Sequence, residues 1–148
     1  MRISAKARYA LASMIHLGQN YNNGENVTVV SISERLGISK IYLEQVFSLL
    51  KRGSLVNSVK GAQGGYQLTR APQKITVLEI MFAVEVSLFE QTETTVPEKA
   101  PEVDKAMVHL IFQSLDSVVR NRLQKITLAD LVTEVEHSKS DQALMYFI

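Results

Sequence analysis

The sequence predicts a mainly α-helical protein with a small β-wing, namely a winged helix-turn-helix DNA-binding domain followed by a long dimerisation helix. Two short helical patterns lie on either side of a turn that contains Gly37, and a glycine-rich hairpin pattern, VKGAQGGYQL, follows them directly. The third observation is charge: residues 1–75 hold ten Lys/Arg against three Asp/Glu, whereas residues 76–148 hold six against twelve. This asymmetry favours a polyanion-binding half, although two solvated surfaces that happen to differ are an alternative.

Length and composition exclude several classes of protein. The 148 residues suit one domain, or one domain with an appended arm, and the absence of cysteine excludes disulfides and thiolate metal ligands. Apolar runs stay far below the roughly 18 residues of a membrane span, and the amino terminus lacks the apolar run of a signal peptide. We therefore expect a cytoplasmic protein without a membrane segment.

Cap residues predict the helices of the first half. Ser4 is a cap for a helix that ends near Gly18, and Thr28 is a cap for a short second helix that Gly37 stops. Ser39 then opens a third helix, which Gly53 ends. The apolar residues of the third helix recur at i, i+3, i+4 and i+7 and form one stripe: Leu43, Val46, Phe47 and Leu50.

The following segments predict a wing, a fourth helix and a loop. The β-rich runs Leu55–Val59 and Tyr66–Leu68 form the hairpin, and a capping box beginning at Thr76 opens a helix to about Val86. The segment Leu88–Pro101 is rich in Thr and Glu and reads as a loop. The predicted organisation is a DNA-binding domain at 1–86, a loop at 87–101, and a dimerisation helix, short helix and tail at 102–148.

A long helix from about Glu102 to Leu123 has apolar residues over too wide an arc for packing on one side. We expect one side to meet a second subunit, because few other elements remain to surround this helix; a central helix in a monomeric core is the alternative. The candidate interface residues are Val103, Met107, Leu110, Ile111, Leu115 and Val118. Thr127 opens a last helix to about Glu136, and the chain ends in an apolar tail.

The outward face of the third helix carries the candidate base contacts. Ile41, Gln45 and Ser48 point away from the apolar stripe, with Glu44 on the shoulder and Lys40 in the first turn. Gln can pair with adenine, Glu can accept from cytosine N4, and Ile can contact a thymine methyl. Alternatively, Glu44 forms an ion pair on a solvated face.

Phosphate contacts are predicted from three segments. Hydroxyl and guanidinium groups that contact phosphates fix the register of the protein on the duplex without reading the base sequence. For Tyr42, packing against the first helix is an alternative to a phosphate contact. A tip rich in glycine can approach a sugar-phosphate wall closely, with Lys60 extending along the minor groove. The candidates are Arg2 before the first helix, Lys6 and Arg8 within it, Ser39, Tyr42 and Arg52 around the third, and Lys60, Gly61, Gln63, Gly64 and Gly65 in the wing.

The stretch SISERLGISKIYLEQVFSLLKRGSLVNSVKGAQGGYQL resembles the signature region of the Rrf-type bacterial winged-helix transcription regulators, and MRISAKARYAL matches their opening. The resemblance extends over nearly the whole chain. It implies a homodimer that binds palindromic operators in double-stranded DNA and pairs through the long helix. It also implies DNA contacts for Tyr42, Glu44, Gln45 and Lys60. In the family, Arg is common at the position that Lys60 occupies here.

Iron–sulfur members of this family carry three cysteines in the loop after the fourth helix, and this chain has none. The resemblance therefore implies no iron–sulfur cofactor of the usual kind and a place in the cysteine-free branch, which includes repressors of cysteine metabolism. Those repressors act with O-acetylserine thiol-lyase, an enzyme that accepts a tail ending in Ile. We expect Tyr146, Phe147 and Ile148 to dock into that enzyme or to fold back on their own dimer.

The sequence leaves three alternatives to a repressor of cysteine metabolism. An enzyme is disfavoured because His16, His109 and His137 lie far apart in sequence and no nucleophile or phosphate-binding motif is present. A winged-helix protein-interaction module is the stronger rival. A regulator that responds to a different small-molecule effector is the remaining alternative, for which no polar constellation in the sequence names a ligand.

Overall fold

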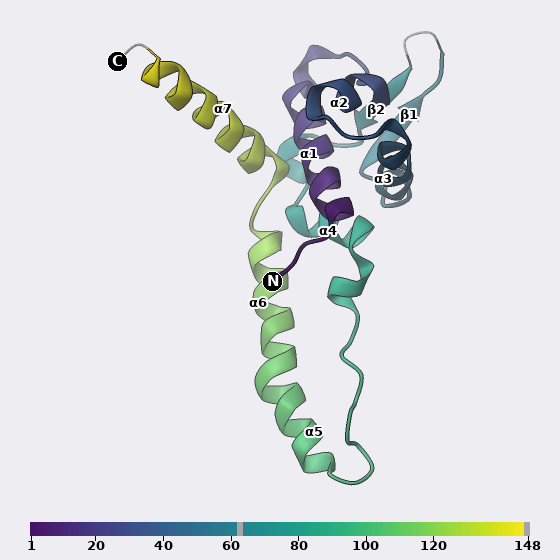
Figure 1. The fold of residues 1–148 in the computed structure, drawn as a ribbon, viewed down its shortest axis with the longest axis vertical. Coiled ribbons are helices and arrows are strands. Elements are labelled where there is room, and N and C mark those ends of the chain that lie inside the picture. Colours follow the sequence, from purple (N-terminus) through teal and green to yellow (C-terminus); the bar gives the residue numbers. More distant parts are fainter. Residues whose placement is uncertain (62–63, 147–148) are drawn as a thin grey trace.

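The computed structural model describes residues 1–61 and 64–146, which form a helical head with a two-stranded wing and a long helical arm (Figure 1). The head contains α1 (Ala5–Gln19), η1 (Tyr21–Asn23), α2 (Val29–Leu36), α3 (Lys40–Arg52), β1 (Val56–Val59), β2 (Gly65–Leu68), η2 (Pro72–Lys74), α4 (Val77–Val84) and η3 (Val86–Phe89). The arm consists of α5 (Pro101–Met107), the π-helical turn η4 (Val108–Phe112) and α6 (Gln113–Gln124), and α7 (Leu128–Met145) returns to the head. The predicted fold class, mainly helical with a small wing, is confirmed.

The predicted caps set the ends of the helices. The Ser4 hydroxyl accepts the N–H of Ala7 at 3.1 Å, and the Thr28 hydroxyl accepts the N–H of Ser31 at the same distance. Each bond satisfies a donor that the first turn of a helix leaves without an intrahelical partner. Gly37 ends α2 in the left-handed region at φ 67°, where glycine bears no steric cost.

One apolar core joins the helices α1 to α4 with the two strands. Its largest fully buried side chains belong to α1, α2, α3, β1 and α4, but Leu128 of α7 is also fully buried. Two backbone hydrogen bonds of 2.8 Å fix this junction: Leu128 N–H donates to the Ile75 carbonyl, and Val77 N–H donates to the Ile126 carbonyl. The chain beyond the arm therefore contributes to the core of the head.

The arm and α7 differ from expectation in detail. The predicted long helix contains a π-helical turn at its middle, and α7 continues to Met145 rather than ending near Glu136. Most residues between 137 and 142 are polar, so they give no apolar periodicity that predicts a helix. They contain no Gly or Pro, however, and side-chain pairs at i,i+4 and i,i+3 support the helix. These pairs join His137 to Asp141 and Lys139 to Glu136, both at 3.4 Å. Within the described residues, no helix is both long and apolar enough to cross a bilayer.

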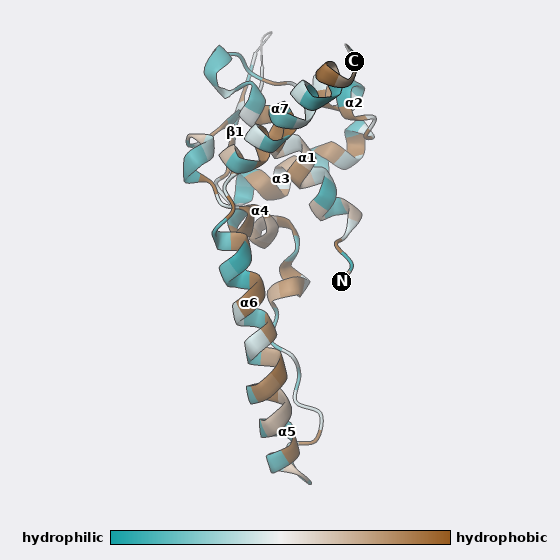
Figure 2. Cartoon of the chain, turned by 90° about the vertical axis from the view of Figure 1, so that its left-hand side faces the viewer, coloured by the Kyte–Doolittle hydropathy of each residue, from teal (hydrophilic) through white to brown (hydrophobic). Residues whose placement is uncertain are grey.

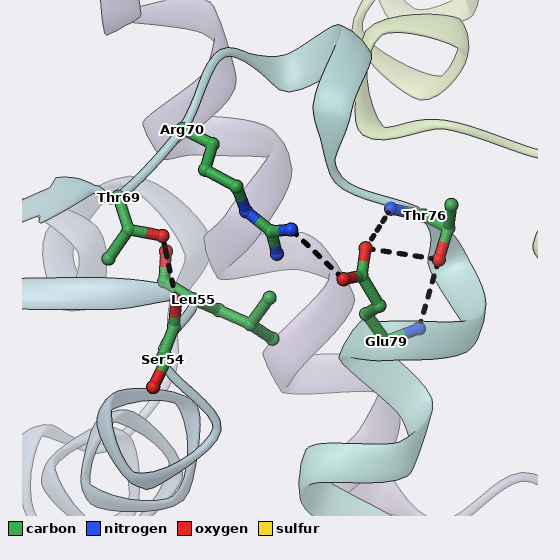
Figure 3. Close-up of polar contacts among 6 residues, drawn as sticks. All are labelled: Ser54, Leu55, Thr69, Arg70, Thr76 and Glu79. Atoms are coloured by element: carbon green, nitrogen blue, oxygen red, sulfur yellow. Dashed lines mark hydrogen bonds and ion pairs between the residues drawn. The ribbon is translucent and has the colours of Figure 1, made fainter.

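The base of the wing is tied to the start of α4 (Figure 3). Glu79 closes the predicted capping box by accepting the N–H of Thr76 at 2.8 Å, and it also accepts Arg70 Nη1 at 3.0 Å. Beside Arg70, the Thr69 hydroxyl donates to the Ser54 carbonyl at 2.7 Å. α4 itself ends at Val84, two residues before the predicted end, and a 3-10 turn follows.

The Glu79 carboxyl has a lowered pKa because its partners outweigh its desolvation. Partial burial alone would raise this pKa, but hydrogen bonds from the Thr76 backbone and from Arg70, together with the Arg70 charge, hold it below 4.5. A carboxyl with a lower pKa in the folded state than in the unfolded chain stabilises the fold above its unfolded pKa. That contribution disappears as the pH falls through the folded-state pKa.

We expect Glu79→Gln to lower the free energy of unfolding by up to about 1 kcal/mol at pH 7, since the pair with Arg70 is partly solvated. Gln can keep the capping-box geometry, so the change isolates the charge. Urea unfolding at one fixed protein concentration measures the difference, which should shrink as the pH falls below 4.5.

Glu134→Gln is the control, because Glu134 is an exposed carboxylate on α7. It should leave the unfolding free energy unchanged at both pH values. A Glu79→Gln deficit that stayed constant between pH 7 and low pH would contradict the assigned role of the charge.

Candidate nucleic-acid interface

α3 has one buried face and one exposed face. Leu43, Val46, Phe47 and Leu50 are fully buried, as the stripe predicted. On the opposite face Ile41 is 72% exposed, an unusual fraction for an aliphatic side chain, and Glu44 and Gln45 are exposed beside it. The helix therefore presents a mixed apolar, acidic and amide surface to solvent.

The exposed face of α3 and the start of α1 form one shallow groove of about 500 Å³. Its lining brings together side chains that were predicted separately as base and phosphate contacts: Lys6, Ile41, Glu44, Gln45 and Ser48, with Leu49 between them. Among the described ion pairs none involves Glu44, so its alternative role as a partner of Lys40 or Lys51 is not observed in this structure. Base contact by these residues stays a prediction.

Tyr42 lies on the side of α3 that faces α1. It is half-buried, and its ring meets the ring of Tyr9 edge to face with centroids 5.2 Å apart. This geometry is favourable for two aromatic rings and fixes the crossing of α1 and α3. The packing alternative for Tyr42 is therefore observed, and a phosphate contact by its hydroxyl stays a prediction.

The start of α1 is held in place from the head. Besides capping α1, the Ser4 hydroxyl donates a short hydrogen bond to the Glu85 carboxylate at the end of α4. Arg2 and Arg8 are exposed on either side of this contact and Lys6 is half-buried. Of the three predicted cations, Lys6 lines the groove, whereas Arg8 lies on α1 and Arg2 before it.

The wing is a two-stranded antiparallel hairpin in which Val59 is paired with Gly65 and Val56 with Leu68. Lys60 and Gly61 are exposed at its tip, and Gln63 lies outside the described residues. A Cβ at Gly64 would come within 2.5 Å of the Val59 carbonyl oxygen, and one at Gly65 within 2.7 Å of the Val27 carbonyl oxygen. The hairpin itself thus requires these two glycines, and a close approach of the tip to DNA stays a prediction.

Two contacts that the sequence analysis missed join the wing to α3. The Tyr66 ring stacks on the buried Phe47 ring with centroids 4.4 Å apart, and Lys51 Nζ donates to the Ser58 hydroxyl at 2.7 Å. The alternation of residues along β2 places Tyr66 on its inner side, and this is the one feature of the sequence that hints at the stack on Phe47. The sequence offers no signal for the second contact, because Lys51 fits equally well as an ion-pair partner of Glu44.

The arm carries exposed apolar side chains. The predicted interface residues Val103, Leu110, Ile111, Leu115 and Val118 are 47–72% exposed, and Met107 is half-buried. Brown apolar segments alternate with polar ones along α5 and α6 in Figure 2. Such exposure along a helix of a folded protein is typical of an interaction surface.

The carboxy-terminal helix ends in apolar side chains as well. Leu144, Met145 and Tyr146 are 62%, 77% and 90% exposed, respectively. Phe147 and Ile148, the other two residues of the predicted docking tail, lie outside the described residues. Tyr146 makes little contact with its own subunit, so docking into the enzyme and folding back on the dimer both stay predictions.

The three histidines do not form a site. His16 is half-buried on α1, and its desolvation, followed by the charge of Arg35, lowers its pKa from the usual value for histidine. His109 is exposed on the arm, and His137 pairs with Asp141 on α7. Their separation gives no general base next to a nucleophile.

The donor atoms of this chain do not fit an iron centre. The sequence has no cysteine, and in the part of the chain that the structure describes no three His, Asp or Glu side chains gather in a metal-binding arrangement. In the loop before α5, the Asp104 carboxylate instead accepts the N–H of Thr95 at 3.1 Å and is nearly buried. This carboxylate thus serves as an acceptor within the loop.

Comparison with known proteins identifies the family. The model of the Rrf2 family, described as "Iron-dependent Transcriptional regulator", matches residues 3–134. The transcriptional regulators IscR of Photorhabdus laumondii and of Klebsiella pneumoniae are 37% and 38% identical over 136 residues, which cover 92% of this chain and 82% of each relative.

Solved structures agree with the sequence relatives. CymR, the global cysteine regulator of B. subtilis, superposes with a TM-score of 0.74 at 30% identity, covering 90% of this chain and 98% of that one. IscR of T. potens superposes with a TM-score of 0.73 at 33% identity, covering 93% and 90%. These relatives are regulators rather than enzymes, as predicted for this chain. With its winged helix-turn-helix and a match over residues 3–134, the chain belongs to the Rrf2 family of transcriptional regulators.

Proposed function

We propose that this protein is a homodimeric regulator that reads a palindromic operator through the groove between α1 and α3. The observation that carries the proposal is the lining of that groove. An amide, a carboxylate, an aliphatic group and a hydroxyl are presented together on the exposed face of a helix that follows a helix-turn-helix, with Lys6 at the edge. This combination suits base edges in the major groove, flanked by phosphate.

The arms supply the second subunit in this proposal. Two copies that pair through Leu110, Leu115 and Val118 would bury apolar surface that is otherwise solvated. A two-fold axis between the arms presents both recognition helices to one side of the DNA. The half-sites should then be about 34 Å apart, or a multiple of it. A protein with this function acts in the cytoplasm, where its DNA lies.

For the regulated genes, we propose cysteine metabolism, with repression aided by O-acetylserine thiol-lyase. The structural similarity to the cysteine regulator CymR supports the gene class. The exposed apolar end of α7 supports a docking tail, because a free carboxylate behind aromatic and aliphatic side chains suits a pocket of backbone donors.

Selection of bound genomic fragments should yield a palindrome, and variants should then separate base contacts from phosphate contacts. Gln45→Ala should weaken binding to the selected operator by about 1–3 kcal/mol and relax preference at one base pair. Arg52→Ala should weaken binding to all duplexes and reduce the slope of log affinity against log salt by about 0.9. Fluorescence anisotropy at several salt concentrations measures both effects.

Lys125→Ala removes the same charge at an exposed position after the arm and is the control for Arg52. It should change neither affinity nor slope. A shallow salt dependence of the unaltered protein, or selection without a palindrome, would favour the protein-interaction alternative.

Leu115→Asp should convert the dimer to a monomer, because two carboxylates would be buried at the paired arms. Leu115 is 59% exposed in the single subunit, so the head should still fold. Sedimentation measures the mass, and operator affinity should fall with it. Gln113→Asp adds the same charge at an exposed position about 160° around α6 from Leu115 and should leave the dimer intact; a dimeric Leu115→Asp protein would refute the interface.

Deleting Tyr146 to Ile148 should abolish capture of O-acetylserine thiol-lyase in a pull-down, whereas operator binding by the free protein should survive. A second variant with one glycine added after Ile148 displaces the terminal carboxylate and should also fail to capture the enzyme. Undiminished capture by the deletion variant would end the docking hypothesis.

A further inference from the structure

A second cleft, separate from the groove on α3, lies behind the wing. It has a volume of about 410 Å³, within the range of small-molecule sites. Its walls come from the end of α1, the η1 turn with the loop after it, and strand β2. None of its lining residues belongs to the predicted DNA contacts.

The lining of this cleft selects for a positively charged ligand. Glu25 is the one charged side chain among the ten lining residues, and it is exposed at the cleft. Two aromatic residues, Tyr21 and Tyr66, line the same space, and tyrosine rings attract cations through their π faces. An anion would meet one carboxylate and no compensating cation.

The remaining lining residues provide an apolar floor and hydrogen-bonding walls. Leu17, Val27 and Leu68 are largely buried and their side chains have no polar atoms, so they can make only van der Waals contacts with the apolar body of a ligand. Asn20, Asn22 and Gln67 contribute carboxamides; that of Asn20 is oriented by a 2.8 Å bond to the His16 carbonyl. A ligand with an apolar or aromatic body and one hydroxyl or carbonyl matches this distribution.

The cleft is connected to the recognition helix by direct contacts. Val27 and Tyr66 exchange two backbone hydrogen bonds of 3.0 and 2.7 Å, which form the inner wall of the cleft. Tyr66 also stacks on Phe47 in the core of α3. A ligand that moves Tyr66 therefore acts on both the wing and α3.

We propose that this cleft binds a small organic cation with an ammonium group and an amphipathic body, held by Glu25 and the two tyrosines. Occupancy is coupled to the angle between wing and recognition helix through Tyr66. The binding site stands on the cleft alone, whereas an effect on operator affinity rests on the proposed function.

Tyramine is a suitable probe, because it carries an ammonium group, an aromatic body and a hydroxyl. Titrated into the ¹⁵N-labelled full chain, it should produce saturable amide shifts in residues 20–27 and 66–68, extending to Phe47. Glu25→Gln should weaken binding about tenfold, the loss expected for one charge-assisted hydrogen bond. The neutral analogue 4-ethylphenol and the anion 3-(4-hydroxyphenyl)propionate should bind more weakly than tyramine.

Glu34→Gln, which removes an exposed carboxylate on α2 outside the cleft, is the matched control and should bind tyramine normally. Equal affinity of the Glu25→Gln variant and the unaltered chain would overturn the proposal. Equal affinity for the anion, shifts confined to other residues, or no saturable shift with either tyramine or pentylamine would also overturn it. Since this readout needs no DNA, failure of the operator experiments leaves its result intact.

Discussion

The burial of one face of α3 is the constraint on which the rest of the head depends. Its four stripe residues are fully buried, so the rotation of the helix about its own axis is fixed. A turn by one residue, 100°, that put Glu44 in the place of Leu43 would bring Val46 toward solvent and Glu44 toward the core. Exposing one large apolar side chain costs about 1.5–3 kcal/mol, and burying an unpaired carboxylate costs more. Packing of the core therefore determines which side chains of α3 face solvent. The residues on the exposed face do not contribute to the core, so they are available for contacts with DNA.

The wing shares this constraint, because its inner side is attached to the same helix. Tyr66 stacks on Phe47, Val27 is bridged to β2, and Arg70 after β2 is paired with Glu79 of α4. These contacts lie on different elements, so no single loop determines the angle of the wing. Recognition helix and wing then approach a duplex as one body, and little conformational entropy is lost on binding.

Much of the fold could be predicted because its boundaries are set by local chemistry. Ser4, Thr28 and Thr76 each accept a backbone N–H of the first helical turn, and such a bond depends on residues only three positions apart. The Val27 bridge and the Phe47–Tyr66 stack join segments 19 or more positions apart, and no periodicity encodes them. The length of α7 was underestimated for another reason: its polar turns lack core contacts, and side-chain pairs support them instead.

The candidate site likewise has a part that the sequence predicts and a part that depends on tertiary packing. Periodicity was sufficient to select the outward residues of α3, whereas their assembly with Lys6 into one groove depends on how α1 crosses α3, which the Tyr9–Tyr42 contact fixes. A signal that changes DNA binding must act on this crossing or on the wing. At the end of α4, the Glu85 carboxylate accepts one hydrogen bond from Ser4 of α1, between half-buried groups. The cleft behind the wing instead touches Tyr66, whose ring rests on a fully buried residue of α3 itself. A displacement there cannot be absorbed by solvent, because Phe47 is packed on all sides, and it must be transmitted to the helix.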